Sequence, residues 1–167
     1  MRANDTCGLE APGVNGSIRR GLFRFIPAIV VLLLAAPGCT APALTTSTYG
    51  SKAANTAEEV VSASRTVLLA AQVGDERRSF PQTIAVTIAD AEIDAESARD
   101  AFVSIQPPDA ASDEIRATLL PDVQNACDVI AEVRIAARRG DIGGLSQVAA
   151  PLEQLADELD GFATRYA

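Results

Sequence analysis

The sequence predicts an all-α protein, an up-down-up-down four-helix bundle preceded by a signal peptide and a flexible tether. Beyond residue 50, apolar residues recur at steps of three and four, the spacing that places them on one face of a helix. The links after the second and third of these stretches are short, with prolines in the former and glycines in the latter, and they favour antiparallel neighbours. We therefore predict a signal peptide over 1–38, a lipidated Cys39 with a tether over 39–50, and the bundle over 51–167.

The predicted signal peptide is centred on an apolar run from Phe25 to Ala36 that follows Arg19, Arg20 and Arg24. This run is too short for a transmembrane helix, which needs about 20 apolar residues, so we predict a removable export signal. The adjacent arginines leave a twin-arginine export route open beside the general secretory route. Acidic residues within 1–17 are unusual before a signal, which leaves a later start of translation open.

The apolar run leads into Ala36-Pro37-Gly38-Cys39, which resembles the lipobox of bacterial lipoproteins, with Ala36 in place of the usual leucine. In that motif the cysteine is acylated and becomes the mature N-terminus. Cleavage after Ala43, in an A-x-A sequence, and an uncleaved anchor are the alternatives. Together with its helical character, the chain resembles the uncharacterised, alanine-rich helical lipoproteins of actinobacteria. This resemblance implies only an address in the cell envelope and supplies no catalytic residue. From the lipobox-like cysteine we predict lipid anchoring at the outer face of the cytoplasmic membrane.

The region after the cysteine divides into a tether and two helices. Residues 40–50 are small and polar without periodicity, so we expect a flexible tether. A first helix is predicted over 51–73, ended by Gly74 and followed by a charged loop over 75–79. Pro81 is suited to the first turn of a second helix, predicted to extend to Ile105.

The third and fourth helices are delimited by capping residues and each contains a proline. Asp109 is the predicted N-cap of the third helix, and Pro121 is expected to kink or break it near Leu120. Gly140 and Asp141 then suggest a C-cap glycine followed at once by the N-cap of the fourth helix, which Pro151 is expected to bend.

Each predicted helix has an inward face of apolar or small residues. The members are Ala57, Val60, Val61, Ser64, Val67, Leu68 and Ala71 in the first helix; Ile84, Ile88, Ala91, Ala95, Ala98, Phe102 and Ile105 in the second; Ile115, Leu119, Val123, Ala126, Ile130, Val133 and Ala137 in the third; and Leu145, Val148, Leu152, Leu155, Leu159 and Phe162 in the fourth.

The charge and the cysteine content limit the possible partners. The whole chain has a net charge of −8, and removal of 1–38 leaves 10 basic and 20 acidic residues. Such a surface disfavours nucleic acid and anionic lipid headgroups, so attachment to a membrane would depend on the acyl chains at Cys39. Cys7 precedes the signal, which leaves Cys127 without a partner in the mature chain, and its apolar surroundings predict a buried free thiol.

The sequence contains no histidine, which excludes histidine-based catalytic sets and haem ligation by histidine. One acidic cluster on the second helix offers possible ligands for a hard cation such as Ca²⁺. The cation ligands would be Asp90, Asp94, Glu96 and Asp100, with Glu92 in the same stretch. A solvated acidic face is the favoured alternative, because the stretch lacks the glycine of an EF-hand loop.

Small residues on the inward face of the second helix suggest a second candidate site. Ala91, Ala95 and Ala98, with Phe102, would either line an apolar ligand pocket or allow close helix packing, and we favour close packing. We predict a non-catalytic envelope binding or adaptor module that needs no cofactor and binds a protein partner. The alternatives are a carrier of a small hydrophobic ligand or lipid, and weak cation binding at the acidic face.

Overall fold

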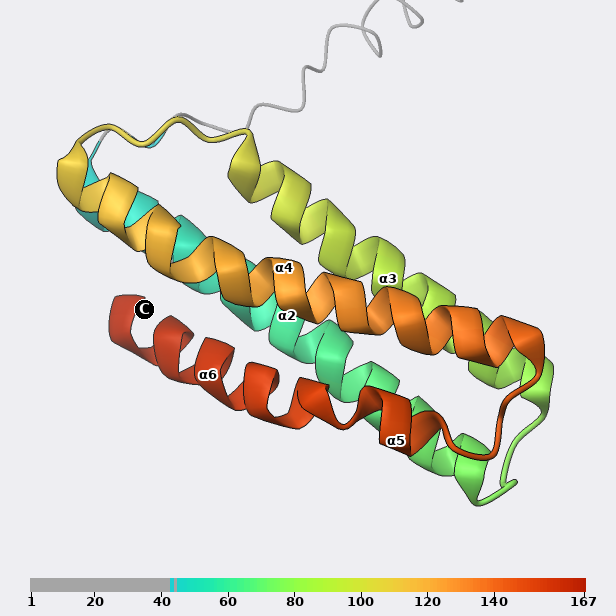
Figure 1. Cartoon of the computed structure of the whole chain (residues 1–167). Coiled ribbons are helices and arrows are strands. Elements are labelled where there is room, and N and C mark those ends of the chain that lie inside the picture. Colours follow the sequence, from blue (N-terminus) through green and yellow to red (C-terminus); the bar gives the residue numbers. More distant parts are fainter. Residues whose placement is uncertain (1–42, 44) are drawn as a thin grey trace, which may run out of the picture. The chain divides into compact units, whose positions relative to one another are not determined.

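The computed structural model describes residue 43 and residues 45–167, and these residues are entirely helical apart from turns and links. The predicted signal peptide, Cys39 and most of the residues before Thr45 lie outside the described residues. The helices are α2 (Thr46–Asp75), α3 (Pro81–Val103), α4 (Ala110–Arg139), α5 (Leu145–Ala149) and α6 (Pro151–Tyr166) (Figure 1). None of the described helices is long and apolar enough to span a membrane.

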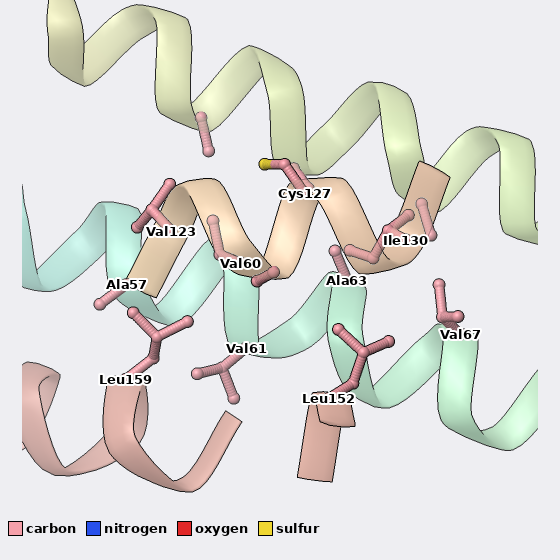
Figure 2. Packing of buried hydrophobic residues seen from close by; sticks show 14 of the residues in the cluster. Ala57, Val60, Val61, Ala63, Val67, Val123, Cys127, Ile130, Leu152 and Leu159 are labelled. Atoms are coloured by element: carbon pink, nitrogen blue, oxygen red, sulfur yellow. The ribbon is translucent and has the colours of Figure 1, made fainter. Parts of the chain in front are cut away.

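The helices pack side by side around one apolar core, with α2 in contact with every other helix (Figure 1). Within the described residues, α3 packs against α2 and α4 but does not contact α5 or α6. Figure 2 shows Leu152 and Leu159 of α6 directed toward α2, with Cys127 of α4 elsewhere in the same core. Helix α3 is therefore covered on fewer sides than α2.

The prediction of a tether through Gly50 was wrong at its end, because α2 begins at Thr46. The Thr45 hydroxyl caps the helix by accepting a hydrogen bond from the Thr48 backbone N–H at 3.2 Å. Tyr49 is fully buried, with its ring centroid 5.3 Å from that of Phe102. One large aromatic side chain thus anchors a polar, threonine-rich stretch to the core.

Gly74 does not end α2 as predicted; it lies inside the helix, which continues to Asp75. A Cβ atom at Gly74 would lie 3.3 Å from Cγ2 of Ile142 and 3.5 Å from Cδ1 of Leu145. The glycine therefore permits close approach of the chain that leads into α5.

Helix α3 begins at Pro81 as predicted and ends at Val103, two residues before the predicted Ile105. Arg116 of α4 binds this end, donating hydrogen bonds to the carbonyl oxygens of Val103 and Ile105, both at 2.9 Å. Orphan carbonyls at a helix C-terminus need such donors. The guanidinium group thereby ties α4 to the end of α3.

The two prolines inside predicted helices have different effects. Helix α4 is continuous through Pro121, so of the predicted kink or short break near Leu120 the break does not occur, and the exposed proline is flanked by buried Leu119 and Val123. Packing on both sides of the proline offsets the lost backbone hydrogen bond. Pro151, by contrast, is the first residue of α6 and separates it from α5.

The predicted caps of α4 are confirmed, whereas the predicted cap of the next helix is wrong. The Asp109 carboxylate accepts from the Ser112 backbone N–H at 2.8 Å, and Gly140 adopts a left-handed C-cap with φ 87°. Asp141 does not cap α5; its N-cap position is Gly144, with φ 128°. The turn after Gly140 is therefore three residues longer than predicted.

The carboxylate of Asp75, at the end of α2, takes the capping role that was predicted for Asp141. It accepts backbone N–H bonds from Gly144, Leu145 and Ser146 at 2.7, 3.0 and 3.2 Å. Burial raises the pKa of Asp75, but these hydrogen bonds outweigh it and hold the pKa below its usual value. The link between α2 and α5 is thus charge-assisted.

The inward faces predicted for α3 and α4 are confirmed apart from Ile105, which is half-buried, and all of the predicted α4 residues are buried. On α5 and α6, Val148 and Leu155 are half-buried, while Leu145, Leu152, Leu159 and Phe162 are buried. Cys127 is a buried free thiol as predicted, and burial raises its pKa to about 11. This thiol is therefore unreactive at neutral pH.

Candidate functional site

Helix α3 carries both candidate sites that the sequence suggested. Its inner stripe is the set of apolar residues that face α2 and α4, each at most 4% exposed. The inner stripe consists of Ile84, Ile88, Ala91, Ala95, Ala98 and Phe102. Because three of the six are alanines, the backbones of α3 and its neighbours can approach closely.

Of the four residues predicted to line a ligand pocket, only one lines a groove on the surface. Ala98 lines a groove of about 380 Å³ between α2 and α3, whereas Ala91, Ala95 and Phe102 line none of the described pockets. The remaining lining residues are Glu59, Ser62, Ala63, Asp94, Ser97 and Ala101. Small side chains form the bottom of this groove and two carboxylates lie along it.

The four predicted cation ligands are all exposed on α3, and the structure does not gather them into one site. Arg99 binds Asp100 at 2.9 Å and lies 3.8 Å from Glu96. Asp90 and Asp94 form no ion pair with any described residue. Within residue 43 and 45–167, no group of three or more potential metal ligands comes together.

The fifth acidic residue of α3, Glu92, has a different role. It forms an ion pair with Arg134 of α4, and the two side chains are only 16% and 23% exposed. The other described ion pairs each include a side chain that is at least half exposed. Since partial burial strengthens a charge pair relative to exposed ones, Glu92–Arg134 fixes the middle of α3 against the C-terminal part of α4.

A second apolar stripe lies on the opposite side of α3 from the core. Val86 and Ile93 are 59% and 62% exposed. Val86 lies two residues from Ile84 and two from Ile88, and Ile93 relates in the same way to Ala91 and Ala95. A step of two residues turns a helix by about 200°, so both side chains point away from the inner stripe.

Ala89 lies three residues after Val86 and four before Ile93, which completes a three-and-four spacing on this side. We call Val86, Ala89 and Ile93 the outer stripe. On α4, Ile135 is 40% exposed and follows Arg134, the partner of Glu92.

Unpaired negative charge accompanies the outer stripe. Asp90 lies four residues after Val86 and three before Ile93, so it borders the stripe, and Asp94 lies one helical turn beyond Asp90 on the side of the groove between α2 and α3. Over its whole length α3 contains five acidic residues and one basic residue, Arg99. This helix therefore combines exposed apolar side chains with a net charge of −4.

The outer stripe was not predicted from the sequence, because the spacing rule was applied to one buried face of each helix. The signal was present, since Val86, Ala89 and Ile93 follow the same spacing rule as the core residues. The Glu92–Arg134 pair was missed because sequence spacing gives no partner on another helix. No protein-family model matches this sequence, and comparisons with curated proteins and with solved structures gave no match.

Proposed function

We propose that this protein is an exported, lipid-anchored cell-envelope protein whose up-down-up-down helical bundle serves as a non-catalytic binding or adaptor module for another protein. The observation that carries the proposal is the outer stripe of α3, which leaves two large aliphatic side chains exposed on a helix that already has a complete buried face. A second apolar stripe at helical spacing is typical of a helix that packs on two sides.

Contacts at both ends of the helices support the proposed topology. The Thr46 hydroxyl at the start of α2 donates to the Asp109 carboxylate at the start of α4, which places these two N-termini together. Asp75 at the end of α2 binds the first residues of α5, as expected if the last helix runs back along α2. The cluster of buried residues extends through α2, α3, α4 and α6.

The proposed location depends on the lipobox-like residues before Cys39. With 20 acidic and 10 basic residues from Cys39 onward, the chain would gain little attraction from anionic lipid headgroups. Acylation of Cys39 would therefore provide the membrane attachment, and the acidic bundle would face a partner outside the membrane.

The test uses the full chain expressed in an actinobacterial host, because the predicted export signal resembles those of actinobacterial lipoproteins. The parent should incorporate a labelled fatty acid and fractionate with membranes, and Cys39→Ala should lose both properties. Chemical crosslinking on intact cells should then join the anchored parent to an envelope protein. Unchanged labelling of Cys39→Ala would refute the anchor, and absence of any crosslinked protein would refute the adaptor role.

A further inference from the structure

We propose that the outer stripe of α3 is the docking surface and that its occupant is a cationic amphipathic helix of a partner protein. This inference rests on the proposed function and names the surface and the chemistry of the partner. It starts from the shape of the stripe. Val86, Ala89 and Ile93 span two helical turns in a line, which matches the ridge that one helix presents to another.

The packing of α3 leaves room for an additional helix on this side. Among the described helices only α2 and α4 contact α3, and Val86 and Ile93 are about three-fifths exposed. A helix laid along the stripe would cover both side chains. Helix α3 would then be packed on both of its apolar sides.

The negative charge of α3 indicates which kind of partner would bind the outer stripe. Asp90 and Asp94 lack ion-pair partners among the described residues and are exposed. Asp90 borders the stripe, and Asp94 lies one turn further along α3, where it also lines the groove toward α2. A second copy of this acidic chain would bring its own carboxylates against them, which is unfavourable. A partner helix with lysine or arginine beside its apolar stripe would instead pair with both aspartates as its aliphatic side chains cover Val86 and Ile93.

The test uses the full lipidated chain in nanodiscs of neutral lipid, with empty nanodiscs as the blank. The probe is a synthetic helical peptide with leucines on one face and lysines elsewhere, compared with the same peptide carrying glutamate in place of lysine. We expect binding of the lysine peptide only. Added salt should weaken this binding, because the charges that attract the peptide are exposed.

Two double variants and two matched controls locate the binding. Val86→Ser with Ile93→Ser should weaken binding of the lysine peptide about tenfold or more through loss of apolar contact. The control Leu69→Ser on α2 removes an equally exposed leucine and should change the affinity for this peptide by no more than about twofold. Asp90→Asn with Asp94→Asn should weaken binding and flatten its salt dependence. Glu153→Gln with Asp157→Asn, an exposed acidic pair of the same spacing on α6, should not.

Several results would overturn the inference. Equal weakening by the α3 and α6 charge variants would mean diffuse attraction to an acidic protein. Binding that survives Val86→Ser with Ile93→Ser would exclude the stripe. A dimer of the parent that this double variant abolishes would mean that a second copy covers the stripe. Thermal melting of each variant confirms that it is folded, and all substituted positions are exposed.

The envelope crosslinking experiment separates failure of this inference from failure of the proposed function. If Val86→Ser with Ile93→Ser still captures the same envelope protein, the adaptor role stands and α3 is not its docking surface. If the peptide binds in the expected pattern while no envelope protein crosslinks to the anchored parent, the docking chemistry stands and the adaptor role is refuted. Loss of capture in this double variant and retention in Leu69→Ser would support both.

Discussion

The two apolar stripes of α3 have the same spacing but different surroundings. The inner stripe meets α2 and α4 and is at most 4% exposed, whereas Val86 and Ile93 of the outer stripe are about three-fifths exposed. Burial by neighbours, and not the presence of a periodic pattern, decides whether such residues stabilise the fold. Of the two stripes of α3, one is therefore part of the core and the other is exposed.

The largest expected difference between the stripes comes from truncating a large residue on each. Phe102→Ala should lower the free energy of unfolding by about 3 to 5 kcal/mol, because Phe102 is 1% exposed and contacts the Tyr49 ring. Ile93→Ala should change it by less than about 0.5 kcal/mol. Urea denaturation of both variants measures the contrast, and similar losses would contradict the assignment of the two sides.

A smaller loss is expected from enlarging the inner stripe. Ala95→Leu should lower the free energy of unfolding by about 1 to 3 kcal/mol, because Ala95 is fully buried and lines none of the described pockets. The matched control is Ala111→Leu, at an exposed position of the first turn of α4. If the leucine at position 95 is tolerated as well as the one at position 111, the inner stripe borders a cavity and the carrier hypothesis gains support.

The inner stripe and most of the other core faces could be predicted from the sequence, because three-and-four spacing is a local property of the chain. Capping at Asp109 and Gly140 was predictable for the same reason. The start of α2 was not, since the helix extends through a threonine-rich segment that is held by burial of Tyr49 on Phe102, a contact across more than fifty residues. Propensity carries no information about such a contact.

The candidate site was predictable in its residues but not in their roles. The acidic residues of α3 were recognised, yet only the fold divides them into three groups: Glu92, bound to Arg134; Glu96 and Asp100, beside Arg99; and the unpaired Asp90 and Asp94. Asp75 was expected in a charged loop, and its capping of α5 depends on how the end of α2 meets a distant turn. Pairings between helices need the tertiary arrangement.

The carboxylate of Asp75 allows a test in which stability depends on pH. Asp75→Ala should cost about 1 kcal/mol at neutral pH through loss of a cap. Because the hydrogen bonds from Gly144 and its neighbours hold the pKa of Asp75 below 3.8, its contribution is present above that pH and is lost as the pH falls through the lower value of the folded state. The melting temperature of Asp75→Ala should therefore fall less than that of the parent between pH 6 and strong acid.

Asp141→Ala is the matched control for this test, because Asp141 is exposed and does not cap α5. It should melt like the parent at both pH values. If Asp141→Ala is destabilised and Asp75→Ala is as stable as the parent, then Asp141 caps α5, as the sequence predicted, and Asp75 does not.

The smallest effect is expected on the acidic side of α3. Asp94→Ala should change the free energy of unfolding by less than about 0.5 kcal/mol, because Asp94 is exposed and forms no ion pair with a described residue. Added Ca²⁺ should raise the melting temperatures of the parent and of Asp94→Ala equally or not at all, since a cation site would require several oxygen ligands around one point. If Ca²⁺ stabilises the parent and not Asp94→Ala, the carboxylates of α3 converge on a cation when one is bound. The outer stripe would then be flanked by a neutralised surface, and its preference for a cationic partner would disappear with the charge.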